Sequence, residues 1–142
     1  MRFDIDQGKI IFIQPQPFDF TGHVDGLIRF IDDSNVLISD FRREKKWYQD
    51  SVQGTLKRHK LEPILMPIAY EYSSKSLNSA VGIYMNYLQV GDLILFPIFN
   101  KREDEEAFCV ISKAFPDSTI FTINCKDLAK EGGILNCVSW SI

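Results

Sequence analysis

The stretch Phe20-Thr21-Gly22-His23-Val24-Asp25-Gly26 places an imidazole and a carboxylate two residues apart, between two glycines. The apolar run 27–31 follows directly. If that run is a strand, its side chains alternate faces with a period of two, so His23 and Asp25 point to the same side. The glycines allow a sharp turn and the close approach of a ligand. The stretch predicts either an acid–base group and an anion in one site, or a turn in which Asp25 merely orients His23.

Outward from this stretch, the two halves of the chain show the same order of elements. The first half predicts a hairpin, a helix and a strand over residues 27–31, 36–39, 41–59 and 63–68. The second half predicts the same order over residues 81–90, 93–99, 103–115 and 119–123. This is a repeated ββαβ unit, which needs its neighbours to bury its faces.

The remaining segments and the helix faces give further expectations. Residues 9–13 are almost continuously apolar and predict a strand buried on both faces, whereas 71–79 predict a polar loop. The glycine pair 132–133 leads into a short predicted strand that carries Cys137. Helical spacing predicts the inward side chains, which are Trp47, Tyr48, Val52 and Leu56 in one helix and Ala107, Phe108, Ile111 and Phe115 in the other.

Length and composition narrow the class of protein. The 142 residues fit one domain, and the fractions of 45% hydrophobic and 25% charged residues are typical of a soluble globular chain. A net charge of −3 disfavours nucleic acid as a partner and favours a cationic ligand. No apolar run reaches the length of a membrane span, and the acidic, alternating residues 1–6 do not read as a signal peptide.

The cysteines indicate a reducing, cytoplasmic compartment. There are three of them, widely spaced and without a CxxC motif, which disfavours both a zinc site and a disulfide framework. Cys109, on the predicted inward side of a helix, and Cys125 are interpreted as core residues. Cys137 is interpreted either as a core residue or as a nucleophile paired with His23.

Three stretches resemble the C-terminal part of the family of agmatine deiminases and bacterial, Porphyromonas-type peptidylarginine deiminases. They are residues 21–26 with Arg29-Phe30, residues 84–88 (Tyr-Met-Asn-Tyr-Leu) and residues 131–140 (Glu-Gly-Gly-Ile-Leu-Asn-Cys-Val-Ser-Trp). They occur in the family's order and span about residues 11–142. The resemblance implies a mixed α/β (α+β) fold, part of a pentein-type α/β propeller of ββαβ repeats, in agreement with the repeat above.

The resemblance also implies the site residues. Cys137 would attack the guanidinium carbon, and His23 would protonate the departing ammonia and then activate water. Asp25 would bind the guanidinium nitrogens by charge-assisted hydrogen bonds. Arg29, pairing with an acid, and Asn86 would support these groups from behind, with no metal or cofactor. A guanidinium would become a ureido group plus ammonia, through a covalent thiouronium intermediate.

The sequence departs from this family in one important respect. The family's enzymes are longer, and their N-terminal half carries a Trp-x-Arg-Asp motif whose aspartate is a second guanidinium-binding acid. No such motif is present. Asp19 and Glu131 lie beside the matching stretches, and each is either a replacement for this acid or, as we favour, a solvated loop residue. We therefore expect residues 1–142 to form one domain, the C-terminal part of a propeller. Its open edges predict self-association or pairing with a missing half.

Substrate and reaction stay partly open at this point. The cationic substrate could be agmatine, which would imply putrescine biosynthesis, or free or peptidyl arginine. One alternative function is a non-catalytic remnant of the fold that binds a ligand or partner. Such a remnant should have Cys137 exposed and unreactive. A further alternative is amidino transfer to an amine, which would use the same groups.

Overall fold

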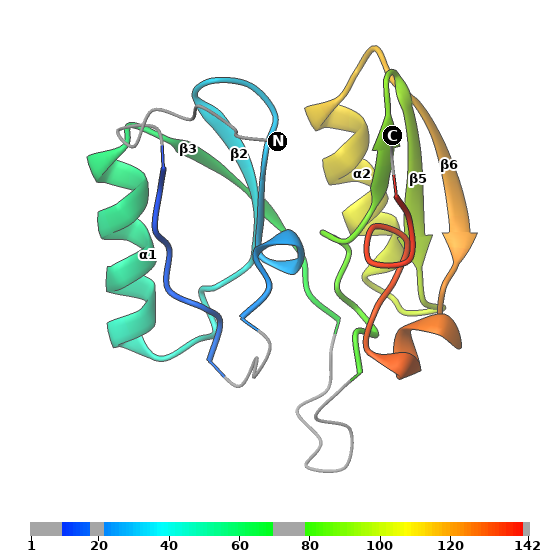
Figure 1. Ribbon diagram of the computed structural model, residues 1–142, viewed down its shortest axis with the longest axis horizontal. Helices are drawn as coiled ribbons and strands as arrows, with labels where there is room; N and C mark the ends of the chain where they lie inside the picture. The colour runs from blue at the N-terminus through cyan, green and yellow to red at the C-terminus, as the bar shows by residue number, and fades with distance from the viewer. Residues whose placement is uncertain (1–9, 18–21, 70–78, 141–142) are drawn as a thin grey trace.

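The computed structural model describes residues 10–17, 22–69 and 79–140, and these form two ββαβ units (Figure 1). The elements of the first unit are β1 (Ile28–Phe30), β2 (Asn35–Ser39), α1 (Lys46–Arg58) and β3 (Glu62–Met66). Those of the second unit are β4 (Leu88–Val90), β5 (Leu93–Ile98), α2 (Asp104–Ala114) and β6 (Thr119–Asn124). The short 3-10 helices η2 (Val24–Gly26) and η3 (Leu128–Glu131) lie before β1 and after β6. The mixed α/β repeat predicted from the sequence is confirmed.

Both units have the same sheet topology. Strand β2 pairs antiparallel with β1 and parallel with β3, and β5 pairs antiparallel with β4 and parallel with β6. Each helix therefore makes the crossover that a parallel pair requires. In the first hairpin, the Asp32 carboxylate accepts hydrogen bonds from the backbone N–H groups of Ser34 and Asn35, which closes the predicted turn.

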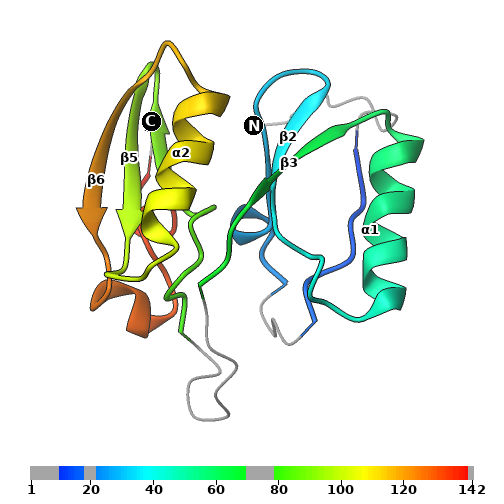
Figure 2. The same cartoon turned by 180° about the vertical axis from the view of Figure 1, so that it is seen from behind.

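The elements lie in four layers, in the order α1, first sheet, α2, second sheet (Figures 1 and 2). Strand β2 is covered on both faces because its side chains alternate. Val36 and Ile38 belong to the cluster that includes residues of α1, whereas Leu37 belongs to the cluster that includes Ala107 and Ile111 of α2. Helix α2 is thus packed between the two sheets and ties the units together.

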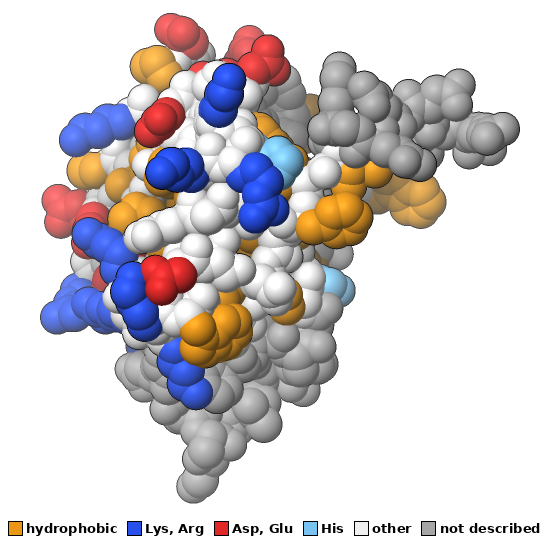
Figure 3. Space-filling view, turned by 90° about the vertical axis from the view of Figure 1, so that its left-hand side faces the viewer, with side chains coloured by type: hydrophobic (Ala, Val, Ile, Leu, Met, Phe, Trp, Pro, Cys, Tyr) orange, Lys and Arg blue, Asp and Glu red, His pale blue; other side chains and the backbone are white. Residues whose placement is uncertain are grey.

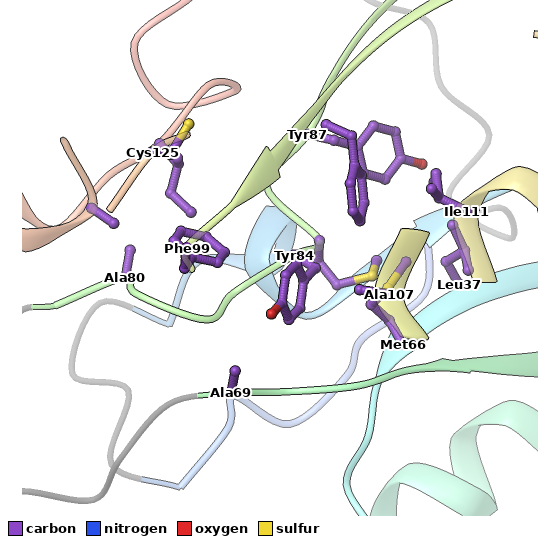
Figure 4. Packing of buried hydrophobic residues seen from close by; sticks show 14 of the residues in the cluster. Leu37, Met66, Ala69, Ala80, Tyr84, Tyr87, Phe99, Ala107, Ile111 and Cys125 are labelled. Carbon is purple, nitrogen blue, oxygen red and sulfur yellow. The ribbon is translucent and has the colours of Figure 1, made fainter. Parts of the chain in front are cut away.

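The larger core cluster is rich in aromatic rings that precede or belong to the second sheet (Figure 4). Tyr84 stacks on Phe96 with ring centroids 5.9 Å apart and meets Phe99 edge-on at 5.2 Å. Both Tyr84 and Tyr87 are almost completely buried. This packing fixes the segment between the two units, which contains Asn86.

Two of the expected strands differ from the structure. Residues 10–13 lie outside any strand, and Phe12 is 85% exposed while Ile11 and Ile13 pack against the smaller core cluster. Within the expected strand 81–90, only Leu88–Val90 is a strand. The residues before it form turns whose side chains are buried in the core. An apolar run indicates burial, but it does not by itself indicate a strand. The expected loop 71–79 lies outside the described residues except for Ser79.

Helix α1 begins at Lys46, not at residue 41. The Asp40 carboxylate accepts hydrogen bonds from the backbone N–H and the guanidinium of Arg42. The Glu44 N–H donates to the Phe41 carbonyl, so this segment forms a turn. Two expected inward side chains are exposed, Trp47 at 56% and Phe108 at 37%. Trp47 precedes the buried Tyr48, and Phe108 follows the buried Ala107. Consecutive residues lie about 100° apart around a helix, so when one of the two faces the core the other is turned toward solvent.

The described part of the chain contains no helix that is long and apolar enough to cross a membrane. That residues 1–142 form one domain, the C-terminal part of a propeller, remains a prediction.

Candidate active site

Three segments that are distant in sequence meet at the Asp25 carboxylate. Asp25 comes from η2, Asn86 from the turn before β4, and Asn136 and Cys137 from the turn at residues 135–138. Asp25 Oδ2 accepts hydrogen bonds from Asn86 Nδ2 at 2.7 Å and Asn136 Nδ2 at 2.9 Å. The Cys137 thiol donates to the same oxygen at 3.4 Å. The fold thus brings a carboxylate and a thiol from opposite ends of the chain into contact.

The Asp25 carboxyl is half-buried, yet it is a stronger acid than usual. Burial by itself raises its pKa, but hydrogen bonds from Asn136, Cys137 and Asn86, together with the charge of His23, hold the pKa below its ordinary value of 3.8. Asp25 is therefore an anion at neutral pH.

His23 lies beside this acid, but in a different local structure from the one predicted. His23 directly precedes the 3-10 helix η2, and Asp25 lies within it. Their relative orientation is therefore set by a helical turn and not by the alternation of side chains along a strand. His23 is the extended residue that precedes η2, and its side chain is exposed. The Ser39 hydroxyl donates to the Gly26 carbonyl and anchors this turn to β2.

Cys137 sits in a turn instead of the expected strand. Its side chain is exposed, and the Val138 N–H bonds back to the Ile134 carbonyl. A Cβ added at Gly133 would lie 3.0 Å from the Cys137 Cβ, closer than real Cβ atoms normally come. Gly132 has a φ of +90°, which favours glycine. The glycine pair therefore allows the turn that presents the thiol to Asp25.

Asn86 contacts both Asp25 and Cys137 directly, and it is only 4% exposed. Its Nδ2 donates to Asp25 and lies 3.2 Å from Cys137 Sγ, while its Oδ1 accepts from the Cys137 backbone N–H at 3.3 Å. The Asn136 N–H donates to the Asn86 carbonyl at 3.2 Å. Asn86 is thus hydrogen-bonded to both of the other segments that meet at the site.

Asn136 is the residue that sequence reasoning missed. In the short strand expected to carry Cys137, neighbouring side chains point to opposite faces, so Asn136 would point away from Cys137. In the turn, both side chains reach Asp25. The only sequence signal was the position of Asn136 directly before the cysteine, next to two glycines that favour a turn.

Arg29 joins the two units, and it forms no ion pair with an acid of residues 10–17, 22–69 or 79–140. Its guanidinium donates to the backbone carbonyl of Tyr87 and stacks on the Tyr87 ring, 4.0 Å from the centroid. Burial raises the pKa of the Tyr87 hydroxyl, and the Arg29 charge partly opposes this. Because Tyr87 directly follows Asn86, Arg29 helps to fix the segment that holds the site.

Neither of the other two cysteines forms a hydrogen bond with Asp25 within the described residues. Cys125 is buried as predicted, and burial raises its pKa, whereas Cys109 is exposed on α2, contrary to prediction. Glu131 ends η3 with its side chain exposed, and Asp19 lies outside the described residues. Within residues 10–17, 22–69 and 79–140, no three His, Cys, Asp or Glu side chains are grouped as a metal site would require.

The comparisons with known proteins point in one direction. Residues 6–142 match the family model described as Porphyromonas-type peptidyl-arginine deiminase. The chain is 23% identical over 144 residues to "Putative agmatine deiminase 2" of Listeria monocytogenes, covering 83% of this chain and 39% of that protein.

Solved structures show the same fold. A C. jejuni agmatine deiminase with substrate bound superposes with a TM-score of 0.68 at 22% identity, covering 88% of this chain and 38% of that one. An Enterococcus faecalis agmatine deiminase gives a TM-score of 0.60 at 20% identity, with 81% and 38% covered. The chain spans about two-fifths of the length of these proteins.

Proposed function

Because the chain belongs to the Porphyromonas-type peptidyl-arginine deiminase family, we propose that it takes part in hydrolysing a guanidinium group to a ureido group and ammonia. The observation that supports this most directly is the 3.4 Å contact between Cys137 Sγ and Asp25 Oδ2, made across 112 residues of sequence. A carboxylate beside a thiol offers a cation-binding group next to a nucleophile.

In the first half of the proposed reaction, Cys137 releases its thiol proton to solvent, and its thiolate forms a C–S bond to the guanidinium carbon while Asp25 binds the guanidinium nitrogens. The carbon–nitrogen bond then breaks, and His23 gives its proton to the leaving nitrogen, which departs as ammonia. The product of this half is a positively charged thiouronium on Cys137. Asp25 stabilises that charge as it did the substrate's.

In the second half, His23 takes a proton from water as the oxygen attacks the thiouronium carbon. The C–S bond breaks and the thiolate returns, while the remaining proton on the attacking oxygen is released to solvent as the ureido C=O forms and the product leaves. The substrate class is a small guanidino compound, such as agmatine or arginine, or a peptidyl arginine. No metal or cofactor takes part in the proposed steps.

Release of ammonia tests this proposal. Purified protein is incubated separately with agmatine, arginine and an arginine-containing peptide, and ammonia and the ureido product are measured. Cys137→Ala should reduce turnover to background, whereas Cys109→Ala, which removes the other exposed thiol, should leave turnover unchanged. No product from any of the three substrates would overturn the proposal for this chain.

A binding module without turnover is the second candidate. Two observations favour it: the chain spans about two-fifths of the length of its relatives, and Cys137 is exposed to solvent. On this alternative, guanidino compounds would raise the thermal stability of the protein without releasing ammonia.

A further inference from the structure

The two oxygens of the Asp25 carboxylate have different surroundings. Oδ2 accepts three hydrogen bonds, from Asn86, Asn136 and Cys137. Oδ1 accepts none from the part of the chain that the structure describes. An ionised carboxylate has about four acceptor positions, so Oδ1 keeps the capacity to bind a donor from a ligand.

The orientation of the Asn86 amide is fixed by its bonds. Its Nδ2 faces two acceptors, the Asp25 oxygen and the Cys137 sulfur, while its Oδ1 faces the Cys137 N–H. A flipped amide would place its oxygen against a carboxylate, which is unfavourable. The Asn86 amide therefore faces Asp25 with its NH2 group as the donor.

Asn136 approaches Asp25 Oδ2 independently of Asn86. Its Nδ2 donates at 2.9 Å, and its backbone N–H is held by the Asn86 carbonyl. Two amides from different segments thus engage the same carboxylate oxygen, and this restricts rotation of the carboxylate.

We propose that Asn136 is a positioning residue which, with Asn86, saturates Asp25 Oδ2 and so directs Oδ1 toward a cationic nitrogen bound beside the Cys137 sulfur. This rests on the proposed function, since it assigns Asp25 as the cation-binding group. The titratable groups that face Asp25 are His23 from its own turn and Cys137 from the C-terminal turn. Both amides are neutral, so they orient the carboxylate without cancelling its charge.

A pair of matched alkylating agents tests this role without requiring turnover. Chloroacetamidine is cationic, and chloroacetamide is its neutral counterpart of nearly the same shape. The second-order rate of Cys137 labelling is measured by mass spectrometry with each agent, and the cationic-to-neutral ratio is taken. Cys109 in the same molecule reports the ratio for an exposed thiol outside the site, and Cys125 should stay unlabelled while the core is intact.

Asn136→Leu keeps the size of the side chain but removes its donor. The ratio at Cys137 should fall about tenfold, because a hydrogen bond to a charged group is lost, while the rate with chloroacetamide stays the same. Asn136→Gln, which retains an amide, should restore part of the ratio. Asn124→Leu is the matched control, since it removes an asparagine whose amide bonds to Asn100 away from the site.

Three results would overturn the inference. They are an unchanged ratio in Asn136→Leu, an equal fall with both agents, which would indicate only a disturbed turn, and a wild-type ratio at Cys137 no higher than at Cys109. Failure of the proposed function looks different: a high ratio that depends on Asn136, together with no ammonia from any substrate, would leave the positioning role standing and remove the hydrolysis.

Discussion

At the scale of single residues, Tyr87 has an unusual environment. Its side chain is fully buried, and its hydroxyl has no hydrogen-bond partner among the described residues. A buried polar group left unpaired costs about 1–3 kcal/mol. The ring itself is useful, since it carries the Arg29 guanidinium.

We predict that Tyr87→Phe stabilises the protein. The ring and its contact with Arg29 remain while the unpaired hydroxyl is removed, so the free energy of unfolding in urea should rise by about 1 kcal/mol. Tyr84→Phe is the matched control, because the Tyr84 hydroxyl donates to Asp104 at 2.6 Å, and its loss should lower the free energy by about 1 kcal/mol. Equal effects of the two substitutions would contradict this reasoning.

At the scale of elements, the start of α2 depends on Asp104. Its carboxylate accepts backbone N–H groups from Phe99 and Lys101 at 3.1 Å in addition to the Tyr84 hydroxyl. Burial first, and then the hydrogen bond to Asp104, raise the pKa of Tyr84 well above its usual range. The carboxylate therefore joins β5, α2 and the segment before β4.

Asp104→Ala should lower the free energy of unfolding by about 2–4 kcal/mol, since it leaves a buried hydroxyl and two backbone donors without their acceptor. Glu105→Ala, an exposed acid in the same helical turn, should cost about 0.5 kcal/mol through the helix dipole alone. Urea unfolding followed by circular dichroism measures both. Similar losses in the two variants would mean that Asp104 acts only through its charge.

At the scale of the whole molecule, the two sheets differ in how they are covered. The first sheet has a helix on each face, whereas the second has α2 on one face only. The uncovered face carries Val90, Leu93 and Phe121, which are 59%, 38% and 58% exposed. The opposite end of the molecule, over α1, is mostly polar and rich in Lys and Arg (Figure 3). Apolar sheet faces are normally buried.

We propose that the uncovered face of the second sheet associates with the same face of a second copy, which offers identical apolar side chains. Light scattering after gel filtration should give a mass above that of the monomer, and Phe121→Lys should shift it to the monomer. Phe12→Lys, which changes an exposed phenylalanine near α1, is the control and should have no effect. A wild-type protein that is monomeric at high concentration would contradict this proposal.

The elements and their order followed from local pattern. The hairpin turn at Asp32, both amphipathic helices and the third strand of each unit could be predicted, because hydrophobic periodicity and turn chemistry act over a few neighbouring residues. The same local view failed where an apolar run enters the core as a turn, as at residues 81–87. Periodicity reports burial, and burial does not by itself distinguish a strand from a packed turn.

The candidate site also has features that the sequence predicts and features that it does not. Sequence alone determined the repeat and the family resemblance, and it identified Cys137, His23 and Asp25 as candidate site residues. Only the tertiary structure decided that Asn86 touches both groups, that Asn136 reaches Asp25 Oδ2, and that Arg29 holds the Tyr87 segment. These contacts join residues 51 to 111 positions apart, and they arise from the packing of α2 between two sheets. No local pattern encodes such a distance.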